Sequence, residues 1–320
     1  MRVLVTGRGS IAQRHILHLR RCVSSLELAV VASAGQVDAS MQRCTILRDF
    51  NHGLAWEPDA VVIASASVRH ADEFEACLRG GLPCLAEKPL AVSRRQLARL
   101  TALAPTAVRG NAVVVGCNLR YLPALDRMAQ ALRDGRVGTL MRAGFEVGQD
   151  LRDWRPHRGT DLGYSGRAGE GGGVVFDLVH EIDLARWILG PLQVRAAVGG
   201  HRSTLPIDSD DVHVALLQSA AGVPVVVSLD YVSRPASRRH VLVGEAGTLV
   251  CDLMSRQLTL GGAGGIVQLA GDSDFDVAAT YHAQMQDWLA SIHDPAHRVK
   301  SPLHDGLATA TLMLDMKEAV

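Results

Sequence analysis

Along the first third of the chain, short apolar runs alternate with longer segments whose apolar residues recur at helical spacing. The apolar runs, which we interpret as buried strands, are residues 2–6, 26–32, 60–64, 82–86 and 112–117. The helical segments are residues 11–21, 71–79 and 92–103. Strands that alternate with helices are typical of parallel sheets with crossover connections, so this part predicts a doubly wound α/β domain.

After about residue 140 the pattern changes to strands that are joined by turn residues. The predicted strands are residues 140–147, 212–218, 223–231, 239–243, 248–253 and 257–260. Several alternate apolar and polar positions, as at Val212, Val214 and Leu216, which is typical of strands with one buried face. Residues 305–320 have the pattern of an amphipathic helix.

Length and charge narrow the class of protein. At about 100–200 residues per domain, 320 residues predict two domains. The chain has 33 basic residues (Lys and Arg) and 33 acidic residues (Asp and Glu). Its net charge is therefore near zero, and it lacks the excess of positive charge typical of proteins that bind nucleic acid or an anionic membrane. No apolar run reaches the ~18–20 residues that span a bilayer, and the N-terminus does not resemble a signal peptide. We therefore expect a cytoplasmic protein without nucleic-acid or membrane partners.

The distribution of cysteine and histidine argues against a metal site. The six cysteines are widely spaced and form no C-x-x-C pair. His157, His201, His213 and His240 are similarly scattered. We predict reduced, mostly buried thiols and no bound metal.

A glycine-rich turn follows the first predicted strand as Gly7-x-Gly9-x-x-Ala12. Gly7 permits the tight turn, Gly9 allows the backbone to approach a pyrophosphate, and Ala12 is small enough for close packing of helix on strand. The N–H groups of the helix start, at Ser10 and Ile11, would face the phosphates. An ordinary turn is the alternative, but the strand before and the helix after favour a dinucleotide site.

The same fingerprint predicts an acidic residue about 20 positions later that binds the ribose 2′-OH. Ser33 occupies that place and no carboxylate is present. A small hydroxyl leaves room for a 2′-phosphate, which favours NADP slightly over NAD as the cofactor. Arg8 and Arg43 are possible partners of such a phosphate.

A charged pair follows the strand at residues 82–86, in the motif Glu87-Lys88-Pro89-Leu90. The carboxyl ends of parallel strands are where open α/β sheets bind ligands. The alternative is a surface ion pair at a strand end. A rigid proline directly after two charges favours the binding site.

With these motifs in this order, the chain resembles the Gfo/Idh/MocA family, which includes glucose–fructose oxidoreductase and inositol dehydrogenase. The motifs that carry the resemblance are residues 7–15 (GRGSIAQRH), 59–70 (DAVVIASASVRH), 87–90 (EKPL), 116–121 (GCNLRY) and 171–183 (GGGVVFDLVHEID). Residues 154–156, 164–165, 230–235 and 244–248 further resemble a subgroup associated with surface-polysaccharide and nonulosonic-acid sugar pathways.

The resemblance implies the fold and assembly. It implies a Rossmann domain at residues 1–118, with a doubly wound parallel sheet. An α/β domain at residues 119–320 would carry a large, mostly antiparallel open sheet for substrate binding and oligomerisation. Family members commonly pair such sheets face to face, so the resemblance implies a homodimer or homotetramer.

Hydride transfer at a carbon that bears a hydroxyl needs a general acid/base and a donor near the oxygen. Lys88 is the first candidate. Asp177 and His180 are the second, because three-residue spacing on a helix predicted at residues 174–189 puts them on one face. Many family members place the acid four residues before the histidine, where this chain has Phe176, so His180 is the safer prediction.

The resemblance implies further contacts by matching motif positions. Arg120, Arg155 and Tyr164 would contact substrate, although a structural role for Arg120 is equally open. Alongside Glu87 and Lys88, Ser65 and His70 would border the cofactor, and His70 has an equally open structural alternative.

The resulting hypothesis is an NAD(P)-dependent oxidoreductase that moves a hydride between nicotinamide and a hydroxyl or ketone carbon of a sugar, sugar derivative or cyclitol. A second hypothesis is redox-neutral elimination or hydrolysis on a sugar, assisted by the same cofactor. A third is a cofactor-bound sensor without turnover, against which Lys88 and His180 argue.

Overall fold

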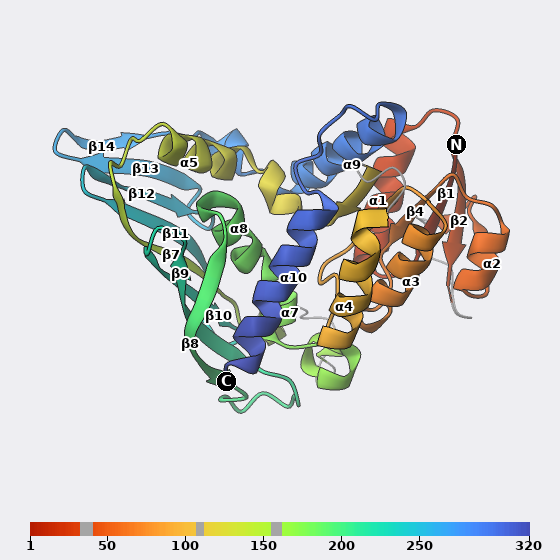
Figure 1. Ribbon diagram of the computed structural model, residues 1–320, viewed down its shortest axis with the longest axis horizontal. Coiled ribbons are helices and arrows are strands. Elements are labelled where there is room, and N and C mark those ends of the chain that lie inside the picture. The colour runs from red at the N-terminus through yellow and green to blue at the C-terminus, as the bar shows by residue number, and fades with distance from the viewer. Residues whose placement is uncertain (33–40, 107–111, 155–161) are drawn as a thin grey trace. The chain divides into compact units, whose positions relative to one another are not determined.

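The computed structural model describes residues 1–32, 41–106, 112–154 and 162–320, and these form two compact units (Figure 1). The first unit comprises Met1–Asn118 and Ala278–Ala310, and the second comprises Leu119–Val277 and Thr311–Val320. The chain thus leaves the first unit after Asn118, and a later segment returns to it.

The first unit is built on a six-stranded sheet with the order β3-β2-β1-β4-β5-β6. All neighbouring strands are parallel. The strands are β1 (Arg2–Thr6), β2 (Glu27–Val31), β3 (Thr45–Leu47), β4 (Ala60–Ile63), β5 (Cys84–Ala86) and β6 (Val113–Val115). The helices are α1 (Ser10–Cys22), α2 (Phe50–Ala55), α3 (Ser67–Arg79), α4 (Arg94–Leu103) and the short η2 (Ala104–Thr106). The order reverses between β1 and β4, which confirms the predicted doubly wound sheet. Sheets of this kind bind ligands at the carboxyl ends of the strands where the order reverses.

The returning segment supplies α9 (Val277–His293) and the start of α10 (Leu303–Glu318). Met285, Trp288 and Leu289 of α9 belong to the same buried cluster as Val3 and Val5 of β1. The Trp288 indole N–H also donates to the Ala112 carbonyl at 3.0 Å. These apolar contacts explain why the segment belongs to the first unit although it lies far along the chain.

The second unit is built on an eight-stranded sheet with the order β14-β13-β12-β11-β7-β10-β9-β8. Only β7 and β10 are parallel neighbours, so the predicted mostly antiparallel open sheet is confirmed. The strands are β7 (Leu140–Gly148), β8 (Leu192–Gly200), β9 (Val212–Ser219), β10 (Pro224–Asp230), β11 (Ser237–Gly244), β12 (Gly247–Asp252), β13 (Gln257–Gly262) and β14 (Gly265–Gln268). The helical elements are η4 (Asn118–Tyr121), α5 (Pro123–Arg133), α6 (Leu151–Trp154), η6 (Gly163–Gly166), η7 (Ala168–Glu170), α7 (Val174–Asp177), α8 (Val179–Leu189) and η8 (Asp272–Phe275).

Among the described residues, helix covers one face of this sheet and not the other, which we call the uncovered face. α8 packs against β7 and β10 (Figure 1), and burial along β9 and β10 alternates residue by residue. Val214, Leu216 and Val226 are exposed on the uncovered face. Val198 of β8 is also exposed.

The helix predicted at residues 174–189 is wrong in one respect, because it breaks at Leu178. Leu178 has φ −97° and ψ 26°, outside the helical region, and separates α7 from α8. Asp177 therefore ends one helix while His180 lies in the first turn of the next. Their three-residue spacing does not put them on one face of a continuous helix.

Candidate functional site

The glycine turn after β1 has the geometry of a phosphate cradle. Gly7 has φ +88°, and a Cβ there would lie 2.4 Å from the Ala64 carbonyl oxygen, so only glycine fits. Gly9 precedes α1, and a Cβ there would meet nothing within 4 Å among the described residues. No side chain caps the start of α1 at Ser10 and Ile11 in the described part of the chain. Ala12 is buried and packs the helix onto the sheet. The backbone N–H groups of Ser10 and Ile11, which no side chain caps in the described part of the chain, are therefore positioned to receive an anion.

The end of β4 lies directly against this turn. A Cβ on Gly7 would lie 3.0 Å from the Cα of Ser65. His70 on α3 holds Ser65 in place, since its Nε2 is 2.9 Å from the Ser65 carbonyl oxygen. His70 Nδ1 is 2.9 Å from the carbonyl oxygen of Pro89, in the motif after β5. His70 therefore connects the residues that follow the carboxyl ends of β4 and β5.

Glu87 is buried beneath the carboxyl end of β5. Its Oε1 is 2.8 Å from His15 Nε2 on α1, and a Cβ on Gly116 would lie 3.0 Å from its carboxyl carbon. Burial by itself raises the pKa of Glu87, but the His15 hydrogen bond and the charges of His15, Lys88 and His70 bring that pKa below its usual value. Glu87 is therefore a buried anion that fixes the strand end, while the neighbouring Lys88 is only partly buried.

In the second unit, Asp177 is oriented by a tyrosine. The Tyr231 hydroxyl donates to Asp177 Oδ2 at 2.7 Å, and both side chains are buried. Burial, followed by the charge of Asp177 and this hydrogen bond, raises the pKa of Tyr231 well above its usual value. Tyr231 therefore stays protonated and remains a donor to the carboxylate. His180 is partly exposed in the first turn of α8.

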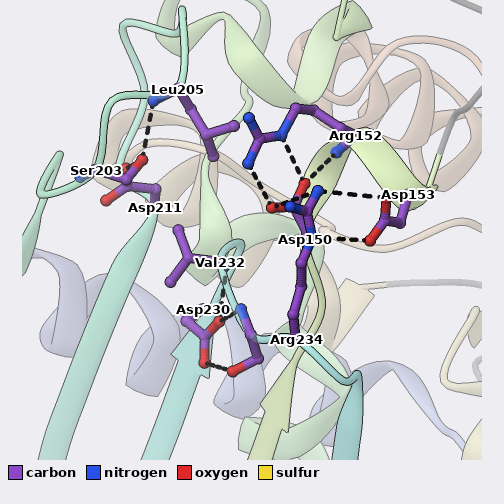
Figure 2. Close-up of polar contacts among 10 residues, drawn as sticks. Asp150, Arg152, Asp153, Ser203, Leu205, Asp211, Asp230, Val232 and Arg234 are labelled. Carbon is purple, nitrogen blue, oxygen red and sulfur yellow. Dashed lines mark hydrogen bonds and ion pairs between the residues drawn. The ribbon is translucent and has the colours of Figure 1, made fainter.

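The backbone around Tyr231 is fixed on both sides. Its N–H donates to the Asp211 carbonyl at 2.8 Å, and its carbonyl accepts from the Leu151 N–H at 3.0 Å. The carboxylate of the preceding Asp230 accepts from the backbone N–H groups of Val232 and Ser233, at 2.8 and 2.6 Å, and so fixes the turn after β10 (Figure 2). The tyrosine hydroxyl is therefore preorganised by the end of β10.

Figure 2 also shows an ion-pair network at the carboxyl ends of β7 and β10. Buried Asp150 accepts from Arg152 Nε and Nη2 at 3.0 and 2.8 Å, and lies 3.1 Å from Arg234 Nη2. Arg234 also pairs with Asp153 at 3.1 Å. The Arg152 hydrogen bond keeps the pKa of Asp150 below its usual value despite burial. The network anchors α6, after which Arg155 follows in sequence.

Some predicted site residues have other surroundings. Arg120 is 0% exposed, and its Nε and Nη2 donate to Asp183 at 2.8 and 2.7 Å, which favours the structural alternative for this arginine. Tyr164 is partly exposed in η6. Ser33 and Arg155 lie outside the described residues, so their predicted roles stay predictions.

The structure thus gathers two groups of predicted residues, each within its own unit. Gly7, Gly9, Ser65 and Lys88 gather at strand ends of the first unit, and Asp177 gains its partner within the second. Among the described residues, no group of three or more His, Cys, Asp or Glu could hold a metal ion. No helix in the described ranges is long and apolar enough to cross a membrane.

Sequence reasoning did not assign roles to His15, Glu73 or Tyr231. Tyr231 and His15 stood inside motifs that were singled out for other reasons. Glu73 lies between Asp72 and Phe74 in a predicted helix, where nothing in the sequence distinguishes it from the neighbouring surface acids. Their partners are distant in sequence, so only the folded chain reveals them.

Comparison with known proteins agrees with this geometry. Residues 1–117 match the sequence profile of an oxidoreductase family with an NAD-binding Rossmann fold, and residues 125–250 match the GFO/IDH/MocA C-terminal domain. Inositol 2-dehydrogenase 1 of Saccharopolyspora erythraea is 29% identical over 305 residues, which cover 90% of this chain and 85% of that protein. Inositol 2-dehydrogenase 2 of the same organism is 31% identical over 261 residues, 78% of this chain and 72% of that protein. Levoglucosan dehydrogenase, solved with NADH and levoglucosan, has the same fold, with a TM-score of 0.84 and 18% identity over 100% of this chain and 96% of that one.

Proposed function

Because the chain belongs to the Gfo/Idh/MocA family of NAD-binding oxidoreductases, we propose that it is a dehydrogenase acting on a hydroxyl-bearing carbon of a cyclitol or sugar. The observation that carries the proposal is the open, uncapped glycine turn at Gly7 and Gly9, on the same carboxyl-end side of the parallel sheet as Lys88, which follows β5. Similarity to two inositol 2-dehydrogenases over most of the chain supports a polyhydroxylated ring as substrate.

The dinucleotide supplies or accepts the hydride when it is bound, and the first unit offers residues that fit it. The backbone N–H groups of Ser10 and Ile11, at the uncapped start of α1, would bind the pyrophosphate. Ala12 keeps that helix close to the sheet, and Ser65 and His70 would shape the neighbouring wall. The absence of an acid at Ser33 favours NADP slightly over NAD, and titration with NADPH and NADH tests this preference directly.

The proton that accompanies the hydride must be moved by the chain itself. We assign Lys88 to the substrate oxygen, where an ammonium group would stabilise developing negative charge. His180 would exchange the hydroxyl proton. Asp177, held by Tyr231, would position or assist that histidine. Arg155 and Tyr164 would contact substrate hydroxyls.

The proposal is tested with purified protein, both nicotinamide cofactors, and a panel of inositols, free sugars and nucleotide sugars. Net change in nicotinamide absorbance supports a dehydrogenase. Product without net change supports the redox-neutral alternative, and dinucleotide binding without turnover of any compound supports the sensor. Lys88→Ala should retain NADH binding and lose at least ~100-fold in kcat. Near-normal turnover by this variant would refute the role of Lys88.

We propose in addition that copies of the chain associate through the uncovered sheet face. Exposed Val198, Val214, Leu216 and Val226 make this face apolar, and apolar patches on soluble proteins mark interaction sites. The expected assembly is a homodimer or homotetramer in the cytoplasm. Light scattering on the wild type and on Leu216→Asp measures it, and a monomeric wild type would refute it.

A further inference from the structure

A buried carboxylate lies within the nucleotide-binding unit, at the carboxyl ends of the central strands β1 and β4. Glu73 is on α3, one turn after His70, and is 6% exposed. Its Oε2 accepts from the Thr6 hydroxyl at 2.7 Å and from the Ser65 hydroxyl at 2.9 Å. Burial of a carboxylate is unfavourable unless hydrogen bonds offset it. Cys77, four residues later on the same face of α3, is completely buried, so an apolar side chain would suit this helix face.

The two hydroxyls that Glu73 binds differ in whether they can make a further hydrogen bond. Thr6 donates its one hydrogen to Glu73 and accepts from the Ala64 N–H at 3.2 Å, so it joins β1 to the end of β4. Ser65 also commits its one hydrogen to Glu73, but it is only partly buried. No described residue donates to the Ser65 hydroxyl oxygen, so its lone pairs can receive a ligand, and they can only accept.

Ser65 lies where a hydroxyl that can only accept a hydrogen bond would select between parts of the dinucleotide. Its Cα lies against Gly7 of the glycine turn, and His70 holds its carbonyl oxygen. The residue is thus fixed through its backbone by His70 and through its side chain by Glu73. An acceptor at this place is matched to the hydroxyl donors of a ribose and mismatched to phosphate oxygens.

We propose that Glu73 is a positioning residue that holds the Ser65 hydroxyl as a hydrogen-bond acceptor for a ribose hydroxyl of the dinucleotide. The inference rests on the proposed function, in which Ser65 borders that cofactor. Glu73 itself touches no ligand. It acts by fixing the direction of the serine hydrogen.

The test is a fluorescence titration with NADH, with ADP-ribose as a competing probe that keeps both riboses and lacks the nicotinamide. Thr6→Val/Glu73→Leu replaces both buried partners with apolar groups, so neither Thr6 nor Glu73 leaves a buried polar group behind and the fold is kept. This variant frees the Ser65 hydroxyl and should weaken binding of NADH and ADP-ribose alike by about 3- to 10-fold, the value of one hydrogen bond. Glu73→Gln is the matched control, because its amide oxygen can accept both hydroxyls, and it should bind within about twofold of wild type.

A double-mutant cycle shows whether Glu73 acts through Ser65. Ser65→Ala should weaken NADH binding, and adding it to Thr6→Val/Glu73→Leu should cause no further loss. A full additional loss would overturn the inference, as would wild-type affinity of Thr6→Val/Glu73→Leu when Ser65→Ala is weakened. An effect that is absent with ADP-ribose would overturn the assignment to ribose. Normal affinity of Ser65→Ala would instead remove the proposed contact of Ser65 with the cofactor, which is a failure of the proposed function. Thermal unfolding of each variant verifies that it is folded.

Discussion

A completely buried histidine in the second unit should make the protein sensitive to mild acid. His240 on β11 is 0% exposed, and neither ring nitrogen has a hydrogen-bond partner among the described residues. Its ring packs on Phe145 with centroids 5.3 Å apart. Burial and the neighbouring charge of Arg238 lower its pKa from 6.5 to about 3. The nearest acid, Glu181, is 4.0 Å away and is already engaged by Arg238.

The sign and size of the effect follow from linkage. The unfolded chain takes up a proton at His240 as the pH falls below 6.5, whereas the folded protein does not until about pH 3. Stability is therefore fully present above pH 6.5 and is lost at about 1.4 kcal/mol per pH unit as the pH falls toward the folded pKa. Between about pH 7.5 and about pH 5, this residue alone should remove about 2 kcal/mol from the free energy of unfolding.

His240→Phe removes the titrating group and keeps an aromatic ring against Phe145. The measurement is urea unfolding, followed by circular dichroism, at a series of pH values for both proteins. The difference in unfolding free energy should shift by about 2 kcal/mol in favour of the variant between about pH 7.5 and about pH 5. His304→Gln is the matched control, because the His304 side chain is 79% exposed, and it should leave the pH dependence unchanged. Parallel curves for wild type and His240→Phe would refute the reasoning.

Three further predictions concern the site and its support. Tyr231→Phe removes the hydroxyl donor 2.7 Å from Asp177, so steady-state kinetics should show kcat reduced by roughly 10-fold with KM little changed; equal kcat would contradict the orienting role. Arg120→Ala takes the bidentate partner from buried Asp183 and should lower the unfolding free energy by about 3–5 kcal/mol, with most of this recovered when Asp183 is also replaced by alanine. Gly9→Val places a side chain in open space, so thermal stability should be unchanged while NADH affinity falls at least ~10-fold; retained affinity would exclude a pyrophosphate there.

The apolar pattern of the chain predicted most strands of both sheets, but it did not predict β3, β8 or β14. These strands have few buried residues, and burial is what produces the pattern. Helix α9 escaped prediction because its buried face includes Thr280 and Gln284, which dilute the apolar pattern. The break at Leu178 was not predicted because no glycine or proline, the residues that usually end a helix, stands at that position.

The glycine turn and the lysine motif could be found from sequence, since their chemistry depends on neighbouring residues. The partners of Glu73 and Asp177 could not. Thr6 is 67 residues from Glu73, and Tyr231 is 54 residues from Asp177. Tertiary packing brings such partners together. Because no fixed sequence spacing separates them, a single sequence does not identify them.

The return of α9 to the first unit has a consequence for synthesis on the ribosome. The Rossmann strands emerge early, but Trp288, which fills their core and binds the Ala112 carbonyl, is translated only near the end of the chain. Until then the nascent nucleotide-binding fold exposes an apolar surface that no N-terminal fragment can cover by itself. An excised cofactor domain therefore needs residues 278–310 fused behind residues 1–118 to be complete.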